Sequence, residues 1–128
     1  MCRPVHPEIT VPASPAAVYH AYTTSREHAE FTGSSARMSS RIGGAFTCGD
    51  ASILGFNLDL VPGKRVVQAW RLSHWKPGVY SLVTLSLTKK GKGTLLVLDH
   101  LAIPPEERGE IDEGWKTYYW NPLKEYFS

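Results

Sequence analysis

Cysteine is scarce in this sequence. The 128 residues include two cysteines, Cys2 and Cys48. Two are too few for a disulfide framework, and their separation does not match the short spacings of metal-binding pairs. We therefore expect free thiols, no metal site and no cofactor.

Long apolar runs are also missing. No stretch approaches the roughly 18 consecutive apolar residues that a membrane-spanning helix requires. The start Met1-Cys2-Arg3-Pro4 leads into polar sequence without the apolar core of a signal peptide. An apolar fraction of 42% and a charged fraction of 20% are ordinary for a soluble globular protein. The sequence predicts a cytoplasmic protein with no membrane contact.

Net charge is small, at +2, and the one dense basic run is Lys89-Lys90-Gly91-Lys92. Its composition is that of a hairpin turn, and no aromatic residues interleave with it, as they do in many nucleic-acid-binding segments. We expect a solvated turn and no nucleic-acid partner.

The length corresponds to one domain built around one core. We expect that domain to span residues 8–128, after a short tail of residues 1–7. The sequence leaves the oligomeric state open between a monomer and a homodimer.

The clearest helical pattern runs from Pro104 to Ser128. Acidic residues come first and lysines later, which is the charge order that a helix dipole favours. At about 100° per residue, one wide face collects the apolar and aromatic side chains. These are Ile111, Trp115, Tyr118, Tyr119, Pro122 and Tyr126, with Leu123 at the edge.

Two residues of this helix do not fit a regular pattern. Pro122 cannot donate a backbone hydrogen bond, so we expect the helix to bend or loosen there. Trp120 lies on the side opposite the aromatic face, where either another part of the chain covers it or a partner can reach it. We assign it to partner binding.

The rest of the chain favours strands. Glu8 to Val11 alternates as a first strand, and two short helices follow, the first capped by Ser14-Pro15. From Ala36 onward the apolar period is two, and turn signals separate the segments. One clean alternation predicts a shared face for Leu54, Phe56, Leu58 and Leu60.

A sheet of this kind needs one face buried, and the last helix carries the apolar surface that can bury it. The sequence therefore predicts an α+β fold. We expect a strongly curved antiparallel sheet of about six to seven strands, wrapped around a long C-terminal helix, with two short helices after the first strand.

Known catalytic motifs are absent from the sequence. No nucleophile elbow, phosphate loop or metal signature accompanies the serines, histidines and carboxylates, so we expect no enzymatic activity. His100 should point inward, either as a hydrogen-bonded core histidine or as a polar contact to a ligand. His20, His28 and His74 lack a suitably spaced partner and are expected on the surface.

The large side chains between sheet and helix have two interpretations. They form a packed core, or they line a cavity for a small hydrophobic molecule. The polar tips of buried Trp, Tyr and His need partners, which a cavity supplies as water or ligand. The candidates for cavity lining are Phe46, Phe56, Leu58, Trp70, Leu85, Leu96, Leu98, His100, Trp115, Tyr118 and Tyr119.

Several segments, taken in order, resemble those of a known family. They are Val18-Tyr19 with Phe31-Thr32, Gly43-Gly44-Ala45-Phe46, Leu60-Val61-Pro62-Gly63-Lys64, Trp70-Arg71 with Trp75, Pro77-Gly78, Thr84-Leu85, Ile103-Pro104, and Gly114-Trp115 followed by Tyr118-Tyr119. The chain is similar in this to the helix-grip fold of the START-like, or SRPBCC, superfamily. More closely, it resembles the C-terminal domain of the activator of heat-shock protein 90 (Hsp90) ATPase.

The resemblance implies a non-enzymatic, co-chaperone-like domain that binds an Hsp90 family chaperone through one sheet face and Trp120. Its alternative implication is a START-like carrier of a small hydrophobic ligand, or a cyclase-type enzyme, that acts in the cavity. The eukaryotic co-chaperone has a separate N-terminal domain ahead of this one. The resemblance therefore extends to binding, and not to ATPase activation by this chain alone.

Overall fold

The computed structural model describes residues 7–128. Within them, seven strands form one antiparallel sheet in the order β1-β7-β6-β5-β4-β3-β2. The strands are β1 (Glu8–Val11), β2 (Arg37–Met38), β3 (Ala45–Cys48), β4 (Ile53–Val61), β5 (Arg65–Leu72), β6 (Ser81–Lys90) and β7 (Gly93–Leu101). The predicted tail of residues 1–7, including Cys2, lies almost entirely outside the described residues.

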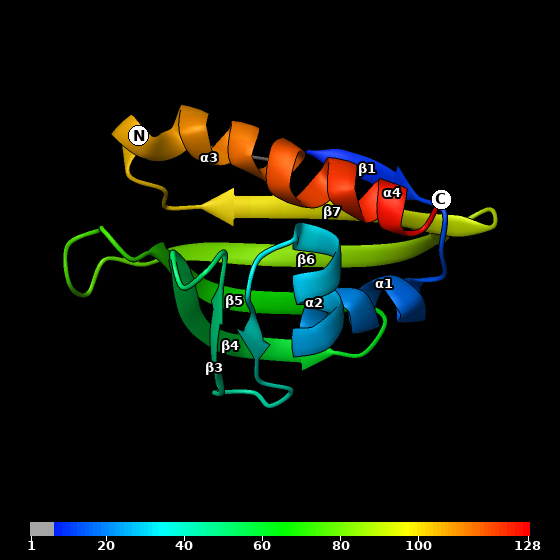
Figure 1. Cartoon of the computed structure of the whole chain (residues 1–128), viewed down its shortest axis with the longest axis horizontal. Coiled ribbons are helices and arrows are strands. Elements are labelled where there is room, and N and C mark those ends of the chain that lie inside the picture. The colour runs from blue at the N-terminus through cyan, green and yellow to red at the C-terminus, as the bar shows by residue number, and fades with distance from the viewer. Residues whose placement is uncertain (1–6) are drawn as a thin grey trace.

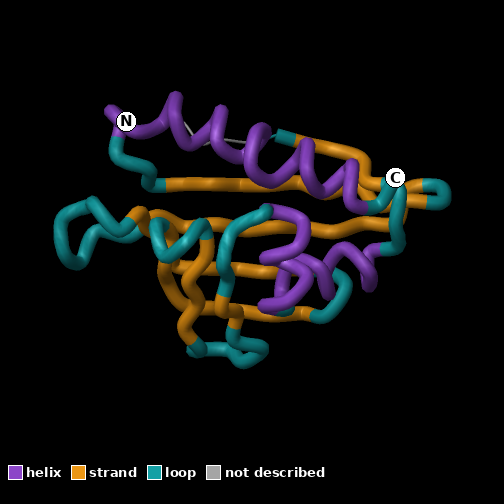
Figure 2. Tube along the Cα trace, viewed as in Figure 1, coloured by secondary structure: helices purple, strands orange, loops and turns teal. Residues whose placement is uncertain are grey.

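The helices lie together on one side of the curved sheet (Figure 1). In the tube view, the strands curve around the C-terminal helix (Figure 2). The helical segments are α1 (Pro15–Thr23), α2 (Ser25–Thr32), the 3₁₀ turn η1 (Pro105–Glu107), α3 (Arg108–Trp115), the π-helical turn η2 (Lys116–Trp120) and α4 (Asn121–Tyr126). The predicted helix-grip architecture is confirmed.

Local signals fix the two short helices between β1 and β2. The side chain of Ser14 accepts the backbone N–H of Ala17 at 3.2 Å, and Pro15 occupies the first helical position. The second helix ends at Gly33, whose φ of 74° is left-handed and suits glycine. Between these ends, α1 buries Val18 and α2 buries Phe31.

A β-bulge interrupts the alternation along β4. The register shifts between Asn57 and Asp59, and Leu58 is the extra residue. Before the bulge, Phe56 faces outward, whereas after it Leu60 pairs with Val66 and packs against the core. A one-residue shift moves every later side chain to the other face. The predicted face shared by Leu54, Phe56, Leu58 and Leu60 is therefore wrong for Leu60, which lies on the inner side, while Phe56 and Leu58 lie on the outer side.

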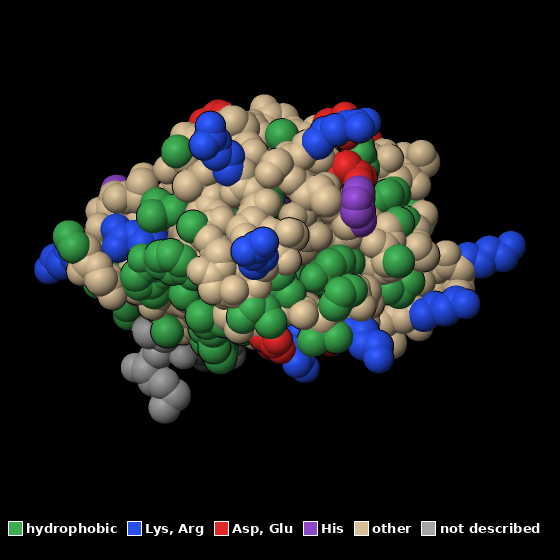
Figure 3. All heavy atoms as spheres, turned by 90° about the horizontal axis from the view of Figure 1, so that it is seen from below, with side chains coloured by type: hydrophobic (Ala, Val, Ile, Leu, Met, Phe, Trp, Pro, Cys, Tyr) green, Lys and Arg blue, Asp and Glu red, His purple; other side chains and the backbone are tan. Residues whose placement is uncertain are grey.

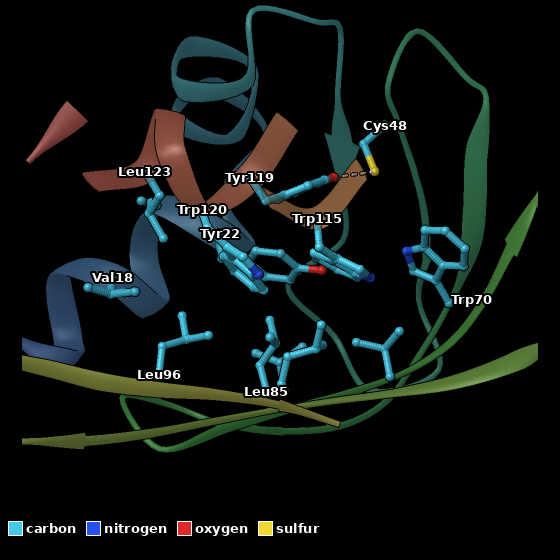
Figure 4. Packing of buried hydrophobic residues seen from close by; sticks show 14 of the residues in the cluster. Val18, Tyr22, Cys48, Trp70, Leu85, Leu96, Trp115, Tyr119, Trp120 and Leu123 are labelled. Carbon is cyan, nitrogen blue, oxygen red and sulfur yellow. Dashed lines mark hydrogen bonds between the residues drawn. The ribbon is translucent and has the colours of Figure 1, made fainter. Parts of the chain in front are cut away.

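The core fills the space between the inner face of the sheet and the helices (Figure 4). The strands contribute Phe46, Val66, Trp70, Val83, Leu85, Leu96 and Leu98, and the helices contribute Val18, Tyr22, Phe31, Ile111, Trp115, Tyr119, Trp120 and Leu123. Trp115 and Tyr119 thus face the strands, which is the arrangement that a helix gripped by the sheet requires.

A π-helical turn lies directly before Pro122. The backbone N–H of Asn121 donates to the carbonyl of Lys116, five residues earlier. In a continuous α-helix, the ring of Pro122 would clash with the carbonyl of Tyr118. The wider turn relieves that clash. The irregularity predicted at Pro122 therefore takes the form of a π turn.

This turn changes which residues face the sheet. Trp120 is 2% exposed and stacks on Trp115, with ring centroids 5.1 Å apart and planes 16° apart. Tyr118 is 65% exposed. The predictions that Trp120 is available to a partner and that Tyr118 faces inward are wrong, because the regular 3.6-residue period fails where the hydrogen bond spans five residues.

Candidate functional site

A pocket of about 360 Å³ opens between α3 and the strand ends beside the β3–β4 turn. This volume falls within the range of small-molecule sites. Four aromatic residues line it, namely Trp70, Trp115, Tyr118 and Tyr119. Small residues from the end of α2 and the β3–β4 turn also line it, namely Thr32, Ser34, Gly49 and Ser52. The remaining lining residues are Ile53, Leu72, Glu110, Ile111 and Gly114.

Gly114 keeps the helix side of this pocket open. A β-carbon at this position would lie 3.8 Å from Cδ2 of Tyr118, an ordinary contact, so packing does not require glycine here. Glycine inside a helix costs about 0.5–1 kcal/mol relative to alanine. A long side chain at position 114 would occupy the pocket.

His100 lies beside the pocket, in a series of hydrogen bonds that runs from Trp115 to the backbone of Trp70. The indole N–H of Trp115 donates to Nδ1 of His100 at 3.0 Å. Because an indole only donates, Nδ1 carries no proton, and the ring proton sits on Nε2. Nε2 then donates to Oγ of Ser81 at 2.7 Å, and that hydroxyl donates to the carbonyl of Trp70 at 2.8 Å.

This tautomer prevents Ser81 and His100 from acting as a nucleophile and its base. A general base would have to accept the Ser81 proton on Nε2, but Nε2 is the protonated nitrogen. Burial also lowers the pKa of His100 to about 3. The residue is a core histidine whose two ring nitrogens are both satisfied, which was one of its two predicted roles.

His28 forms a second buried network, and its expected surface position is wrong. Its Nδ1 donates to the carbonyl of Tyr22 at 2.7 Å, and its Nε2 accepts from the Tyr119 hydroxyl at 2.9 Å. The thiol of Cys48 completes the chain by donating to the same hydroxyl at 3.2 Å (Figure 4). His20 and His74 are exposed, as expected.

Burial shifts the proton equilibria of both partners in this network. It lowers the pKa of His28 to about 4, against a smaller upward effect of the hydrogen bond to Tyr22. It raises the pKa of Cys48 to about 11, against the smaller effect of its hydrogen bond with Tyr119. Near neutral pH the imidazole is therefore uncharged and the thiol keeps its proton.

One buried donor is left over. Nε1 of Trp120 finds no hydrogen-bond partner among the described residues. The stack on Trp115 fixes the ring, so the indole N–H remains unpaired against the core. An unpaired buried donor costs free energy of folding, so the inward position that the π turn gives Trp120 is partly unfavourable.

The residues predicted to line a cavity divide into three groups. Those at the pocket are Trp70, Trp115, Tyr118 and Tyr119. Those buried in the core but not part of the pocket lining are Phe46, Leu85, Leu96, Leu98 and His100. Phe56 and Leu58 are 45% and 49% exposed on the outside, so for them the cavity prediction is wrong.

The outward position of Phe56 has a specific cause. Its neighbour Asn57 faces inward, where it accepts a hydrogen bond from Gln68, and Gln68 in turn accepts one from the Tyr22 hydroxyl. Strand β4 therefore buries a polar side chain whose hydrogen bonds are satisfied, whereas its more apolar side faces outward.

The sequence analysis did not predict that three residues belong to this region: His28, Glu110 and Gly114. His28 precedes Phe31 by three residues, so both share one helix face, and that spacing indicates a buried histidine. A glycine directly before Trp115 was visible, but nothing local shows which way it faces. Glu110 lies in a run of acidic residues, and such a run is typical of a solvent-exposed helix face.

A second feature lies on the outer face of the sheet, which none of the described helices covers (Figure 1). Register places Phe56, Ala69, Leu82 and Leu101 side by side across four strands. Tyr80 packs against Phe56, with ring centroids 6.2 Å apart. We name these five residues and Leu58 the outer patch. Figure 3 shows hydrophobic side chains gathered on this side of the molecule.

Comparison with known proteins decides the family. A family model described as "Activator of Hsp90 ATPase homolog 1-like protein" matches residues 12–128. The chain belongs to this family. The human activator of 90 kDa heat shock protein ATPase homolog 1 is 32% identical over 114 residues, which are 89% of this chain and 34% of the human protein. The homologue from Dictyostelium discoideum is 34% identical over 116 residues, which are 90% of this chain and 30% of that protein.

Solved structures of this family and its fold superpose on the chain. An HSP90 activator from Plasmodium falciparum has a TM-score of 0.82 and 26% identity, with 94% of each chain covered. CalU16 from Micromonospora echinospora has a TM-score of 0.83 and 24% identity, over 98% of this chain and 76% of CalU16. A solution structure of an Aha1 dimer from Colwellia psychrerythraea has a TM-score of 0.81 and 13% identity, with 95% and 94% covered. The last two show a shared fold.

The chain spans about one third of the length of the curated activators it matches. Those relatives are named for activating an ATPase. Among residues 7–128, no group of three or more His, Cys, Asp or Glu side chains is placed to hold a metal ion. None of the helices described in this range is long and apolar enough to cross a membrane.

Proposed function

We propose that this chain is a non-enzymatic, co-chaperone-like domain that binds a chaperone of the Hsp90 family. Membership of the activator family carries the proposal, supported by 32% identity to the human activator over 89% of the chain. The Plasmodium falciparum activator is similar along 94% of both chains, so a single domain of this size has a counterpart described as an HSP90 activator.

The outer patch is the contact surface that we assign to the chaperone. Contiguous apolar side chains rimmed by polar ones are typical of protein-binding sites. Phe56 and Tyr80 supply its two large aromatic groups, and the guanidinium of Arg71 lies 5.6 Å over the Tyr80 ring. Aromatic and Arg side chains are the residue types that most often dominate interface energies. This assignment replaces Trp120, which is buried.

The test is titration calorimetry of the chain against a purified Hsp90 family chaperone from the same organism. Phe56→Ser and Leu58→Ser should each weaken binding about tenfold or more, because each removes a large exposed apolar group from the outer patch. Tyr118→Ser is the control, since Tyr118 is also an exposed apolar residue but lies at the pocket on the other side of the sheet. Its affinity should stay within about twofold.

Two outcomes contradict the proposal in different ways. Absence of binding by the intact chain overturns the function. Binding that Tyr118→Ser weakens and Phe56→Ser does not overturns the choice of surface.

A second function is favoured by the pocket at Trp115. We propose that it takes a small apolar molecule, because Gly114 leaves it open where packing does not require glycine. Native mass spectrometry of gently isolated protein should then reveal a bound small molecule that Gly114→Leu removes. Isolated protein without such a mass would speak against this function. The locked tautomer of His100 argues against the cyclase-type alternative in this space.

The proposal keeps the cytoplasmic location and the choice between monomer and homodimer that the sequence predicts. Cell fractionation and light scattering of the purified chain test these two points. Neither result bears on the chaperone contact itself.

A further inference from the structure

The charge in the lining of the pocket at Trp115 is negative. Among the described residues that line it, Glu110 is the one charged side chain, and no Lys, Arg or His takes part. Glu110 sits in the first turn of α3, with Glu113 three residues further along the same helix. A ligand that enters here meets negative charge that no lining cation offsets.

Two hydroxyl groups of the pocket wall, those of Thr32 and Ser52, are left as acceptors. Oγ1 of Thr32 donates its proton to the carbonyl of His28 at 2.7 Å. Oγ of Ser52 donates its proton to the carbonyl of Gly49 at 2.6 Å. Since each hydroxyl has a single proton, what these two side chains can still offer a ligand is lone pairs. At these two positions, the wall therefore favours a ligand that donates hydrogen bonds.

The aromatic residues add to the same preference. The faces of Trp and Tyr rings carry negative potential and attract cations. Trp70 and Trp115 lie with centroids 6.0 Å apart, and Trp115 and Tyr119 with centroids 4.7 Å apart, so three lining rings form one cluster. An apolar ligand body packs against these rings, and a positive group among them is stabilised.

We propose that the ligand of this pocket is an organic cation, an apolar body that carries a protonated amine. The amine is held by the Glu110 carboxylate and the hydroxyl lone pairs, and the body lies against Trp70, Trp115 and Tyr119. This inference rests on the second function proposed above, ligand binding in the pocket, and is independent of the chaperone contact.

Three probes with one body separate charge from shape: 4-phenylbutylamine, 4-phenylbutan-1-ol and 4-phenylbutanoate. Titrations followed by amide shifts in ¹H–¹⁵N spectra of the intact chain should rank the amine first, about tenfold tighter than the carboxylate, with the alcohol between them. Glu110→Gln should bring the amine to within about twofold of the alcohol. Glu113→Gln, on the same helix but outside the lining, should leave the order unchanged.

Two further measurements distinguish a wrong cation preference from a wrong binding site. Gly114→Leu should abolish binding of all three probes, because its side chain fills the pocket. The amine preference should shrink in 0.5 M NaCl, since Glu110 lies at the surface and salt screens it. Equal affinities for the three probes, abolished by Gly114→Leu, overturn the cation preference and support the pocket. Binding of none of them, or binding that Gly114→Leu does not affect, overturns both.

Discussion

The indole N–H of Trp115 donates to Nδ1 of His100 over 3.0 Å, and this bond joins the C-terminal helix to β7. It also fixes the proton of His100 on the other ring nitrogen. Protonation of Nδ1 would set two donors against each other, so the contact between helix and sheet depends on an uncharged histidine.

Stability should therefore fall in acid. The folded pKa values of His28 and His100, about 4 and about 3, lie below the ordinary 6.5, so between these limits the unfolded chain binds more protons than the folded one. The contribution is complete above pH 6.5 and is lost as the pH falls towards 4. At pH 5, each histidine should contribute roughly 1.4 kcal/mol per pH unit to the slope of the free energy of unfolding against pH. Urea unfolding at several pH values measures this slope.

His28→Asn should reduce this slope, whereas replacing the exposed His74 in the same way should not. A free energy of unfolding that is constant from pH 7 to pH 4.5 would contradict the buried, uncharged state of the two histidines.

Substitutions of Trp120 should separate a core role from a binding role. Trp120→Ala empties a buried site and should cost about 3–5 kcal/mol. Trp120→Phe keeps most of the ring and removes the unpaired N–H, so its cost should stay within about 1 kcal/mol. Urea denaturation measures both. Similar small losses for both variants would mean that the ring is not packed in the core.

Cys48 should be nearly inert in the folded protein. A thiol pKa of about 11 in place of 9.0 lowers its thiolate fraction at pH 8 about a hundredfold, and burial blocks access as well. The rate of reaction with a disulfide reagent, measured in a Cys2→Ser background, should rise at least that much in denaturant. Equal rates in the folded and unfolded chain would disprove this.

Two glycines should respond in opposite ways to alanine. A β-carbon at Gly55 would lie 1.8 Å from the backbone oxygen of Ala69, a contact that the paired strand cannot relieve cheaply. Gly55→Ala should cost about 3 kcal/mol or prevent folding. Gly109 has nothing within 4 Å and lies in α3, so Gly109→Ala should stabilise by about 0.5–1 kcal/mol. Thermal unfolding compares the pair.

Sequence patterns predicted those parts of the fold that depend on near neighbours. Alternation located the strands, and Ser14 with Pro15 marked the start of the first helix. Two of the errors arise where one extra residue enters a periodic element, for Leu60 after the bulge of Leu58 and for Tyr118 and Trp120 in the π turn before Pro122. Each insertion reverses the facing of large side chains without changing the type of element.

The candidate site was harder to predict because its partners are distant in sequence. His28 is buried through a hydrogen bond to Tyr119, 91 residues later. Phe56 faces outward because its neighbour Asn57 joins a buried polar row that starts at Tyr22 on another element. Local hydrophobicity carries no information on either pairing.

The strand order has a consequence for synthesis on the ribosome. Strands β3 to β7 follow one another as adjacent hairpins, so each can pair as soon as the next emerges. Strand β1 leaves the ribosome before the other six described strands, yet it pairs with β7, where Val11 meets Thr94. It must therefore remain unpaired until β7 has been synthesised, and this edge of the sheet forms last.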